Sequence, residues 1–137
     1  MAKKKAKPKA QKVWGWVFSP TVTETQKVAI SKQFEPIIEE LKKNITPLPE
    51  PQEFNHCVDI FSKWNKNFFY IMQKFKAGKG GIVDYFEMGL ARLEYYGEGK
   101  FNLAYFRHTG QWFTINQDIS TEDAQKAILE DPWFDVF

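Results

Sequence analysis

The stretch FNHCVDIFSKWNKNFFYIMQKF, residues 54–75, decides the fold because its apolar side chains recur at every second position. Asn65-Lys66-Asn67 tolerates left-handed backbone, which favours a tight turn between two strands. The residues after it, Phe68 to Phe75, predict a returning strand. In the first strand, strict alternation predicts Val58 and Ile60 on one side, with the opposite side formed by Cys57, Asp59, Phe61 and Lys63.

Further strands follow the glycine-rich break KAGKGGIVD at residues 76–84. Residues 85–96, YFEMGLARLEYY, alternate again, which predicts Phe86, Met88, Leu90 and Arg92 on one side. Turns at 97–99 and 108–111 separate this strand from Lys100–Arg107 and Trp112–Ile115. The pattern predicts a five-stranded antiparallel meander.

Helical signals flank the strands. Thr23-x-x-Gln26 is typical of a capping box, and apolar residues then recur at helical spacing up to Ile45. Pro36 interrupts this stripe and predicts a kink, or a break into two helices near residue 35. Ser120 is expected to cap a second, short helix that ends at Asp131-Pro132.

These elements predict an α+β fold, in which the two helices cover one face of the sheet. A chain of 137 residues is the size of one ordinary domain. We expect a disordered lysine-rich arm at residues 1–12, hereafter the arm, because it has like charges and no apolar periodicity. Residues 13–137 are expected to form the single domain, with Val13–Phe18 as a short edge strand.

Charge is distributed unevenly along the chain. The arm carries Lys3, Lys4, Lys5, Lys7, Lys9 and Lys12. These six belong to the 19 basic side chains, so the other 13 stand against 17 acidic ones. The body of the protein is therefore acidic, above all at residues 118–137, and the arm is the most cationic segment.

The single cysteine, Cys57, excludes an internal disulfide, and no apolar run is long enough for a signal peptide or a membrane span. A cytoplasmic location without membrane partners is the expectation. His56 and Cys57 are strand neighbours that point to opposite faces, so they predict no thiol–imidazole pair. One cysteine and two histidines also predict no metal site and no cofactor, and Cys57 is expected to be a small buried hydrophobe. The pattern predicts no particular oligomeric state.

The arm is the strongest functional feature, because lysines neutralise phosphates and release counterions without sequence preference. The simpler interpretation is a solvated, solubilising end. Trp14 and Trp16, with Phe18, would lie on one face of an extended segment and could stack on unpaired bases. The favoured interpretation of these rings is that they pack the start of the domain onto its body.

A second aromatic platform is predicted if four ring residues share the open face of the sheet, with Arg92 and Arg107 as cationic partners. These rings are Trp64, Phe69, Tyr105 and Trp112. Core packing is the alternative for each of them. The AGKGG stretch lacks the Gly-Lys-Ser/Thr ending of a phosphate loop, so it predicts a flexible connection between hairpins.

Three segments, VDIFSKW (58–64), FNLAYFRHTGQW (101–112) and AILEDPWFDVF (127–137), carry a family resemblance. Together they resemble a bacterial family of small proteins catalogued only as a domain of unknown function, over roughly residues 30–137. The resemblance implies a leading helix, a proline-rich crossing, strands and a closing helix with an acidic-Pro-aromatic ending. It supplies no catalytic residue, and the arm is not part of the family pattern.

The sequence therefore favours a non-enzymatic binding module that holds nucleic acid or another polyanion, with no catalytic residue. Its expected binding residues are the six arm lysines with Trp14, Trp16, Arg92 and Arg107. One alternative is a protein-interaction adaptor that uses exposed aromatic side chains. The other is a small-ligand enzyme in which two of His56, His108 and Asp59 converge in a cleft.

Overall fold

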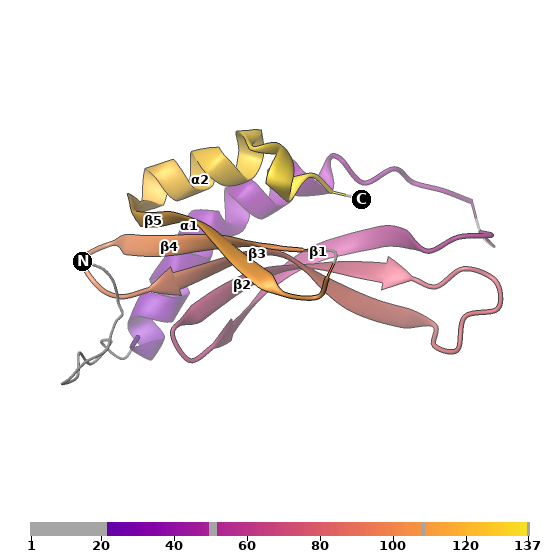
Figure 1. The fold of residues 1–137 in the computed structure, drawn as a ribbon, viewed down its shortest axis with the longest axis horizontal. Coiled ribbons are helices and arrows are strands. Elements are labelled where there is room, and N and C mark those ends of the chain that lie inside the picture. The colour runs from indigo at the N-terminus through magenta and orange to yellow at the C-terminus, as the bar shows by residue number, and fades with distance from the viewer. Residues whose placement is uncertain (1–21, 50–51, 108, 137) are drawn as a thin grey trace.

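The computed structural model describes residues 22–49, 52–107 and 109–136, and these form an α+β fold (Figure 1). The arm, the expected edge strand at Val13–Phe18 and His108 lie outside the described residues, so the predicted domain boundary at residue 13 stays a prediction. In chain order the elements are α1 (Glu24–Lys42), β1 (His56–Asn65), β2 (Phe68–Lys76), β3 (Tyr85–Tyr95), β4 (Lys100–Phe106), β5 (Trp112–Ser120), α2 (Thr121–Glu130) and the 3₁₀ turn η1 (Pro132–Phe134).

The five strands form one antiparallel sheet in the order β1-β2-β3-β4-β5, which confirms the predicted meander. The turn between β1 and β2 is the predicted one, with Lys66 at a positive φ of 55°. The last strand, β5, extends to Ser120, farther than the predicted end at Ile115.

The first helix begins with the predicted capping box. The Gln26 amide donates to the Thr23 hydroxyl over 3.1 Å, and the Thr23 amide donates to the Gln26 side chain over 2.9 Å. The predicted break near residue 35 is wrong, because α1 continues through Pro36. Phe34 and Ile37 are buried on either side of Pro36. Burial of several such side chains, each stabilising by about 1.5–3 kcal/mol, offsets the roughly 3 kcal/mol cost of an internal proline.

The predicted alternation in β1 is wrong at its start. The pairing of β1 with β2 shifts between Cys57 and Asp59, which makes Val58 the extra residue of a β-bulge. Cys57 and Ile60 are therefore both buried, at 4% and 0% exposure, whereas Val58 is 38% exposed. Because of this inserted residue, the side chains that precede it in the strand point to the face opposite to the one that strict alternation predicts.

A second bulge divides β3. Ile71 of β2 pairs with Ala91, whereas the next residue, Met72, pairs with Gly89, so Leu90 is the extra residue. The predicted alignment of Arg92 with Phe86 and Met88 is wrong for this reason. Arg92 lies on the opposite face of the sheet, together with Gly89.

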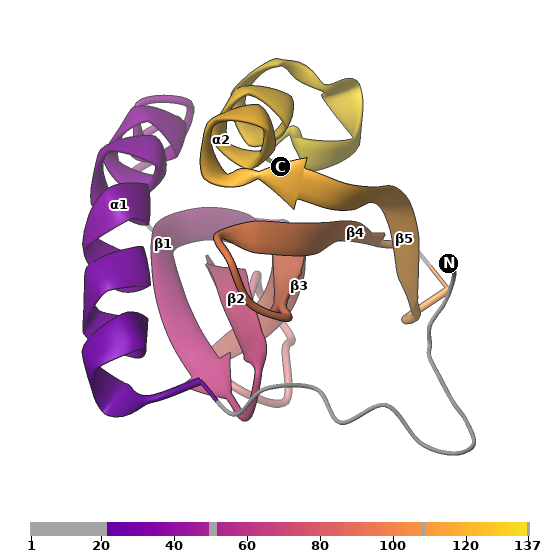
Figure 2. The same cartoon turned by 90° about the vertical axis from the view of Figure 1, so that its left-hand side faces the viewer.

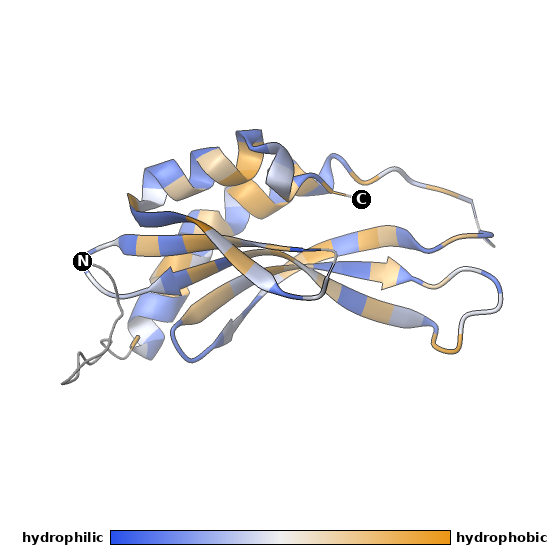
Figure 3. Ribbon diagram, in the orientation of Figure 1, coloured by the Kyte–Doolittle hydropathy of each residue, from blue (hydrophilic) through white to orange (hydrophobic). Residues whose placement is uncertain are grey.

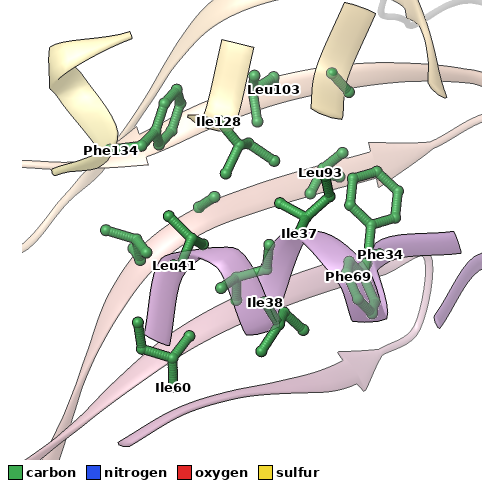
Figure 4. Close-up of a cluster of buried hydrophobic side chains, with 14 of the residues drawn as sticks. Phe34, Ile37, Ile38, Leu41, Ile60, Phe69, Leu93, Leu103, Ile128 and Phe134 are labelled. Carbon is green, nitrogen blue, oxygen red and sulfur yellow. The ribbon is translucent and has the colours of Figure 1, made fainter. Parts of the chain in front are cut away.

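The core lies between the sheet and the two helices (Figure 2), where α1 lies beside β1 and α2 lies over β4 and β5. Phe34 of α1 contacts Phe69 and Phe101, with ring centroids 5.4 and 6.1 Å apart. Figure 4 shows Ile37, Ile38 and Leu41 entering the same cluster from α1, and Ile128 and Phe134 entering it from the C-terminal segment. Figure 3 shows the apolar and polar residues that alternate along the strands.

The C-terminal helix also follows its signals. The Asp123 amide donates to the Ser120 hydroxyl over 3.1 Å, and the helix ends before Pro132 as predicted. Phe134 is 1% exposed, so the acidic-Pro-aromatic ending docks on the core. Within the described ranges, no helix is both long and apolar enough to cross a membrane.

Candidate functional site

The face of the sheet that points away from both helices, hereafter the second face, carries a cluster of rings around one arginine. Tyr70, Arg92 and Ala104 follow one another across β2, β3 and β4 in register. Phe106 of β4 pairs with Trp112 of β5. Directly opposite residues of antiparallel strands share a face, so these side chains gather there. The cluster consists of Phe68, Tyr70, Arg92, Phe106 and Trp112.

Trp112 reaches across the sheet to a glycine. A Cβ atom at Gly89 would overlap the indole ring, so the indole lies directly on the Gly89 backbone. The same ring lies 5.6 Å from Tyr70 and 5.1 Å from Phe106, centroid to centroid. Ala104 is only 1% exposed. The cluster is therefore a packed, half-buried layer rather than a set of separate surface rings.

Arg92 provides the positive charge of this layer. Its guanidinium carbon lies 4.7 Å from the Phe68 ring centroid and 5.5 Å from that of Trp112, which are cation–π distances. Within the described part of the chain, no hydrogen bond or ion pair joins this guanidinium to another residue. The nearby Glu94 instead accepts from the Asn102 amide over 3.3 Å. The planar guanidinium is held by rings, and its N–H donors remain available for an anion.

The predicted platform is correct only in part. Trp112 and Arg92 meet on the second face as predicted, but Phe69 is fully buried under α1, so its placement on an open face is wrong. Trp64 packs on Phe69 at 5.1 Å and donates from Nε1 to the Ser31 hydroxyl, also on the helix side.

Two other members of the predicted platform are also placed elsewhere. Tyr105 packs against the core and stacks on Trp133 of η1 at 4.6 Å. Arg107 lies 5.3 Å from the ring of Phe113, so the prediction that it partners the same platform as Arg92 is wrong. The other predicted binding residues, namely the six arm lysines with Trp14 and Trp16, lie outside the described residues.

Sequence reasoning missed Phe68, Tyr70 and Phe106 as members of the cluster. One signal in the sequence could have found them: Gly89 is a glycine inside a strand pattern, which marks close approach of another group. Phe68 and Tyr70 also alternate with the buried Phe69 and Ile71, and therefore belong to the opposite face.

Two residues of the enzyme hypothesis, His56 and Asp59, lie on β1, whereas His108 lies outside the described residues. Asp59 accepts from the Ile60 amide over 2.9 Å and lies 3.5 Å from the ammonium of Lys42 on α1. A solvent-open hollow of about 340 Å³ is lined by Lys74, Tyr85, Phe86 and Glu87, and its lining includes neither His56 nor Asp59.

Cys57 is buried and donates to the Asp59 carbonyl oxygen over 3.5 Å. Burial raises the pKa of its thiol, so it is a poor nucleophile at neutral pH. This confirms the expectation of a small buried hydrophobe. Across residues 22–49, 52–107 and 109–136, no three histidine, cysteine or acidic side chains form a group that could hold a metal ion.

The AGKGG stretch acts as a structural connection. The Gly78 amide donates to the Asn55 side chain over 2.9 Å, and the Lys79 amide donates to the Gln52 carbonyl oxygen over 3.1 Å. A side chain at Gly78 would overlap the backbone of Glu53 and Phe54. Amides that are already bonded within the protein do not cradle a phosphate, and this supports the expectation of a connection between hairpins.

Among the comparisons with known proteins, only the one with protein-family models gives a match. No curated protein and no solved structure matches it. The sequence model of one family matches residues 22–134, which begins somewhat before the predicted residue 30 and leaves the arm outside. The match includes every residue of the aromatic cluster on the second face. The chain therefore belongs to the family described as Domain of unknown function (DUF3024).

Proposed function

We propose that this protein is a non-enzymatic module that binds single-stranded nucleic acid. The bases stack on the aromatic cluster of the second face, Arg92 pairs with a phosphate, and the arm adds affinity that does not depend on sequence. The observation that carries this proposal is the guanidinium of Arg92, which lies between Phe68 and Trp112 and has no carboxylate partner among the described residues.

The aromatic cluster and the arm contribute to binding in different ways. Stacking of a base on an exposed aromatic ring contributes about 1–3 kcal/mol and tolerates any base. The body outside the arm has 13 basic against 17 acidic side chains, so its overall charge opposes a polyanion. The six lysines of the arm supply the long-range attraction. Affinity should therefore depend on both parts, and salt should affect mainly the arm.

The test is a titration of a fluorescently labelled single strand, followed by anisotropy, with the full chain and with a chain that starts at Val13. The full chain should bind more tightly, and its affinity should fall more steeply with salt. For each phosphate that the arm neutralises, its deletion should reduce the slope of log affinity against log salt by about 0.7. Equal, salt-insensitive or absent binding in both chains would overturn the proposal.

A cytoplasmic location is part of this proposal. The single cysteine is reduced and buried, which suits a reducing compartment where single-stranded nucleic acid is available.

Protein interaction is the second candidate, and a different surface favours it. Phe54, Ile82 and Val83 are 80%, 102% and 55% exposed. The hydrogen bonds that join Gln52 and Asn55 to the β2–β3 connection bring these apolar side chains to one end of the molecule. A protein partner that is retained after nuclease treatment and after deletion of the arm, but is lost in Phe54→Ser and Ile82→Ser, would favour this candidate.

A further inference from the structure

The second face carries positive charge at two places along β2. Tyr70 and Lys74 both lie on this face, because they alternate with buried residues of the strand. They pair in register with Arg92 and Glu87 of β3. The two pairs are separated by about 14 Å, the length of four strand residues. Arg92 and Lys74 thus lie at opposite ends of a strip of the second face, hereafter the strip, that follows β2.

An apolar floor lies between the two ends of the strip. Met72, midway along it, pairs with Gly89, on whose backbone the Trp112 indole lies. Phe61 of β1 pairs with Met72 from the other side. Phe61, Met72 and Trp112 are each partly exposed. The strip therefore has a cation at each end and a partly exposed apolar centre on which planar groups can stack.

The Lys74 end of the strip is the solvent-open hollow of about 340 Å³ that is lined by Lys74, Tyr85, Phe86 and Glu87. The Lys74 ammonium lies 4.5 Å from the Tyr85 ring centroid, and the Lys76 ammonium lies 6.0 Å from it. Two ammonium groups beside one ring repel each other, and an anion between them relieves this repulsion. The volume of the hollow is in the range of ligand sites, about 300–1,000 Å³.

Two carboxylates flank Lys74, and each forms an ion pair with a different lysine. Asp59 of β1 pairs in register with Lys74, but its carboxylate lies 3.5 Å from the ammonium of Lys42. The Glu87 carboxylate lies 3.6 Å from the ammonium of Lys63. Within the described residues, no ion pair joins Lys74 itself to a carboxylate. Its ammonium can therefore donate to an anionic ligand without breaking an existing pair.

We propose that the hollow beside Tyr85 is a second phosphate subsite, and that a single strand of nucleic acid runs along the strip from Arg92, over the Trp112 ring, to Lys74. This inference rests on the function proposed above and names its ligand class. The ligand is an oligonucleotide that places one phosphate at each end of the strip and stacks its bases between them. A mononucleotide has one phosphate group and occupies only one end. A polyanion without bases makes no use of the apolar floor.

The test is an anisotropy titration of the full chain with a labelled thymidine oligonucleotide of about eight nucleotides, a typical site size. Lys74→Gln should weaken binding about threefold to tenfold. It should also reduce the slope of log affinity against log salt by about 0.7, the value for one phosphate contact. The matched control is Lys126→Gln, which removes the same charge from an exposed position of α2, on the other side of the sheet.

The control should change both quantities little. Lys74→Arg keeps the charge and should retain the wild-type affinity. Lys74 is a partly exposed side chain, and thermal unfolding checks that its substitution leaves the fold intact. Equal losses of affinity in Lys74→Gln and Lys126→Gln would overturn the second subsite.

A strand of the same length with abasic nucleotides tests the role of the floor. This strand keeps the phosphates but has no bases to stack on Trp112. Lys74→Gln and Lys126→Gln should bind it equally, because stacking no longer guides a phosphate to the hollow. A larger loss in Lys74→Gln with the abasic strand would overturn the path over Trp112.

The titration of Arg92→Gln separates this inference from the function on which it rests. If Arg92→Gln weakens binding of the thymidine strand and Lys74→Gln does not, the proposed function stands and the path along the strip is overturned. If the wild-type chain binds no single strand, the proposed function is overturned and the second subsite with it.

Discussion

The indole ring of Trp112 on β5 lies on the backbone of Gly89 on β3, two strands away in the sheet. The contact requires the absence of a side chain at residue 89. The intervening strand, β4, lies beneath this contact and contributes the almost fully buried Ala104. The same indole also contacts Tyr70, Phe106 and Arg92, so the absence of a side chain at Gly89 lets Trp112 join the other members of the aromatic cluster.

Gly89→Ala should therefore destabilise the protein by about 1–3 kcal/mol, the range for overpacking a close contact. Urea denaturation measures the free energy of unfolding. In a chain that already has Trp112→Ala, the same change should cost much less, because the methyl group then meets no ring. Equal costs in both backgrounds would show that the indole does not constrain this position.

Arg92→Gln should weaken binding of a labelled single strand about tenfold, roughly 1.4 kcal/mol, since it removes both a charge-assisted hydrogen bond and a cation–π interaction. Arg107→Gln is the matched control, because Arg107 packs on Phe113 and lies outside the cluster. The control should change the affinity little. A similar decrease in both variants would mean that only overall charge matters.

Pro36→Ala should stabilise the protein by about 1–3 kcal/mol, because an internal proline removes a helical hydrogen bond and its ring strains the preceding turn. The buried residues on either side of Pro36 keep α1 continuous, so the substitution needs no rearrangement. Pro132→Ala is the control, since Pro132 occupies the start of η1, where proline is compatible. Thermal unfolding checks both, and a lower melting temperature for Pro36→Ala would contradict the expectation.

The hydroxyl of Tyr96 donates to Asp118 over 2.5 Å. Burial, together with this carboxylate, raises the pKa of Tyr96 above its ordinary value of 10.0. The folded state therefore keeps the phenolic proton at a pH at which the unfolded state loses it. This contribution to stability is complete below pH 10 and is lost as the pH rises above that value.

Urea denaturation between about pH 8 and pH 11 checks this dependence, because an unperturbed tyrosine titrates near pH 10. The decline in unfolding free energy above pH 10 should be shallower in Tyr96→Phe, which cannot ionise. Tyr85→Phe is the control, because Tyr85 is half exposed at 49%. Identical pH profiles for the wild type and Tyr96→Phe would contradict the expected linkage.

Cys57 should react slowly with a chromogenic disulfide reagent at neutral pH, because its thiol is buried and its pKa is raised. In denaturing urea the reaction should become fast, with one thiol released per chain. Absorbance follows both reactions. A fast reaction in the native protein would contradict the described burial of Cys57.

The sequence predicts the architecture because its signals are local. The alternation of FNHCVDIF and FFYIMQKF, the capping box at Thr23 and the cap at Ser120 each act within a few residues, and the elements that they predict are confirmed. The wrong prediction of a break in α1 has a different origin. The cost of Pro36 is local, but the packing that outweighs it comes from the sheet, which the helix pattern does not reveal.

The face of the sheet on which each strand side chain lies is predicted less well, because no sequence pattern reliably indicates a bulge. Val58 and Leu90 are ordinary strand residues, yet each shifts the pairing by one position. Extrapolated alternation therefore assigns Cys57 and Arg92 to the wrong sides. Alternation alone can assign Phe68 and Tyr70 to the second face. Their meeting with Arg92 and Trp112 depends on the bulge at Leu90 and on contacts across several strands, which alternation does not predict.

Each strand of the meander pairs only with its neighbours along the chain. Such an arrangement has low contact order, and hairpins can assemble one after another with little loop-closure entropy. Docking of Phe34 against Phe101 is different, because it brings the N-terminal helix onto a strand formed much later in the chain. During synthesis, α1 can pack on β1 and β2 as they form, but its packing is complete only after β4 has emerged.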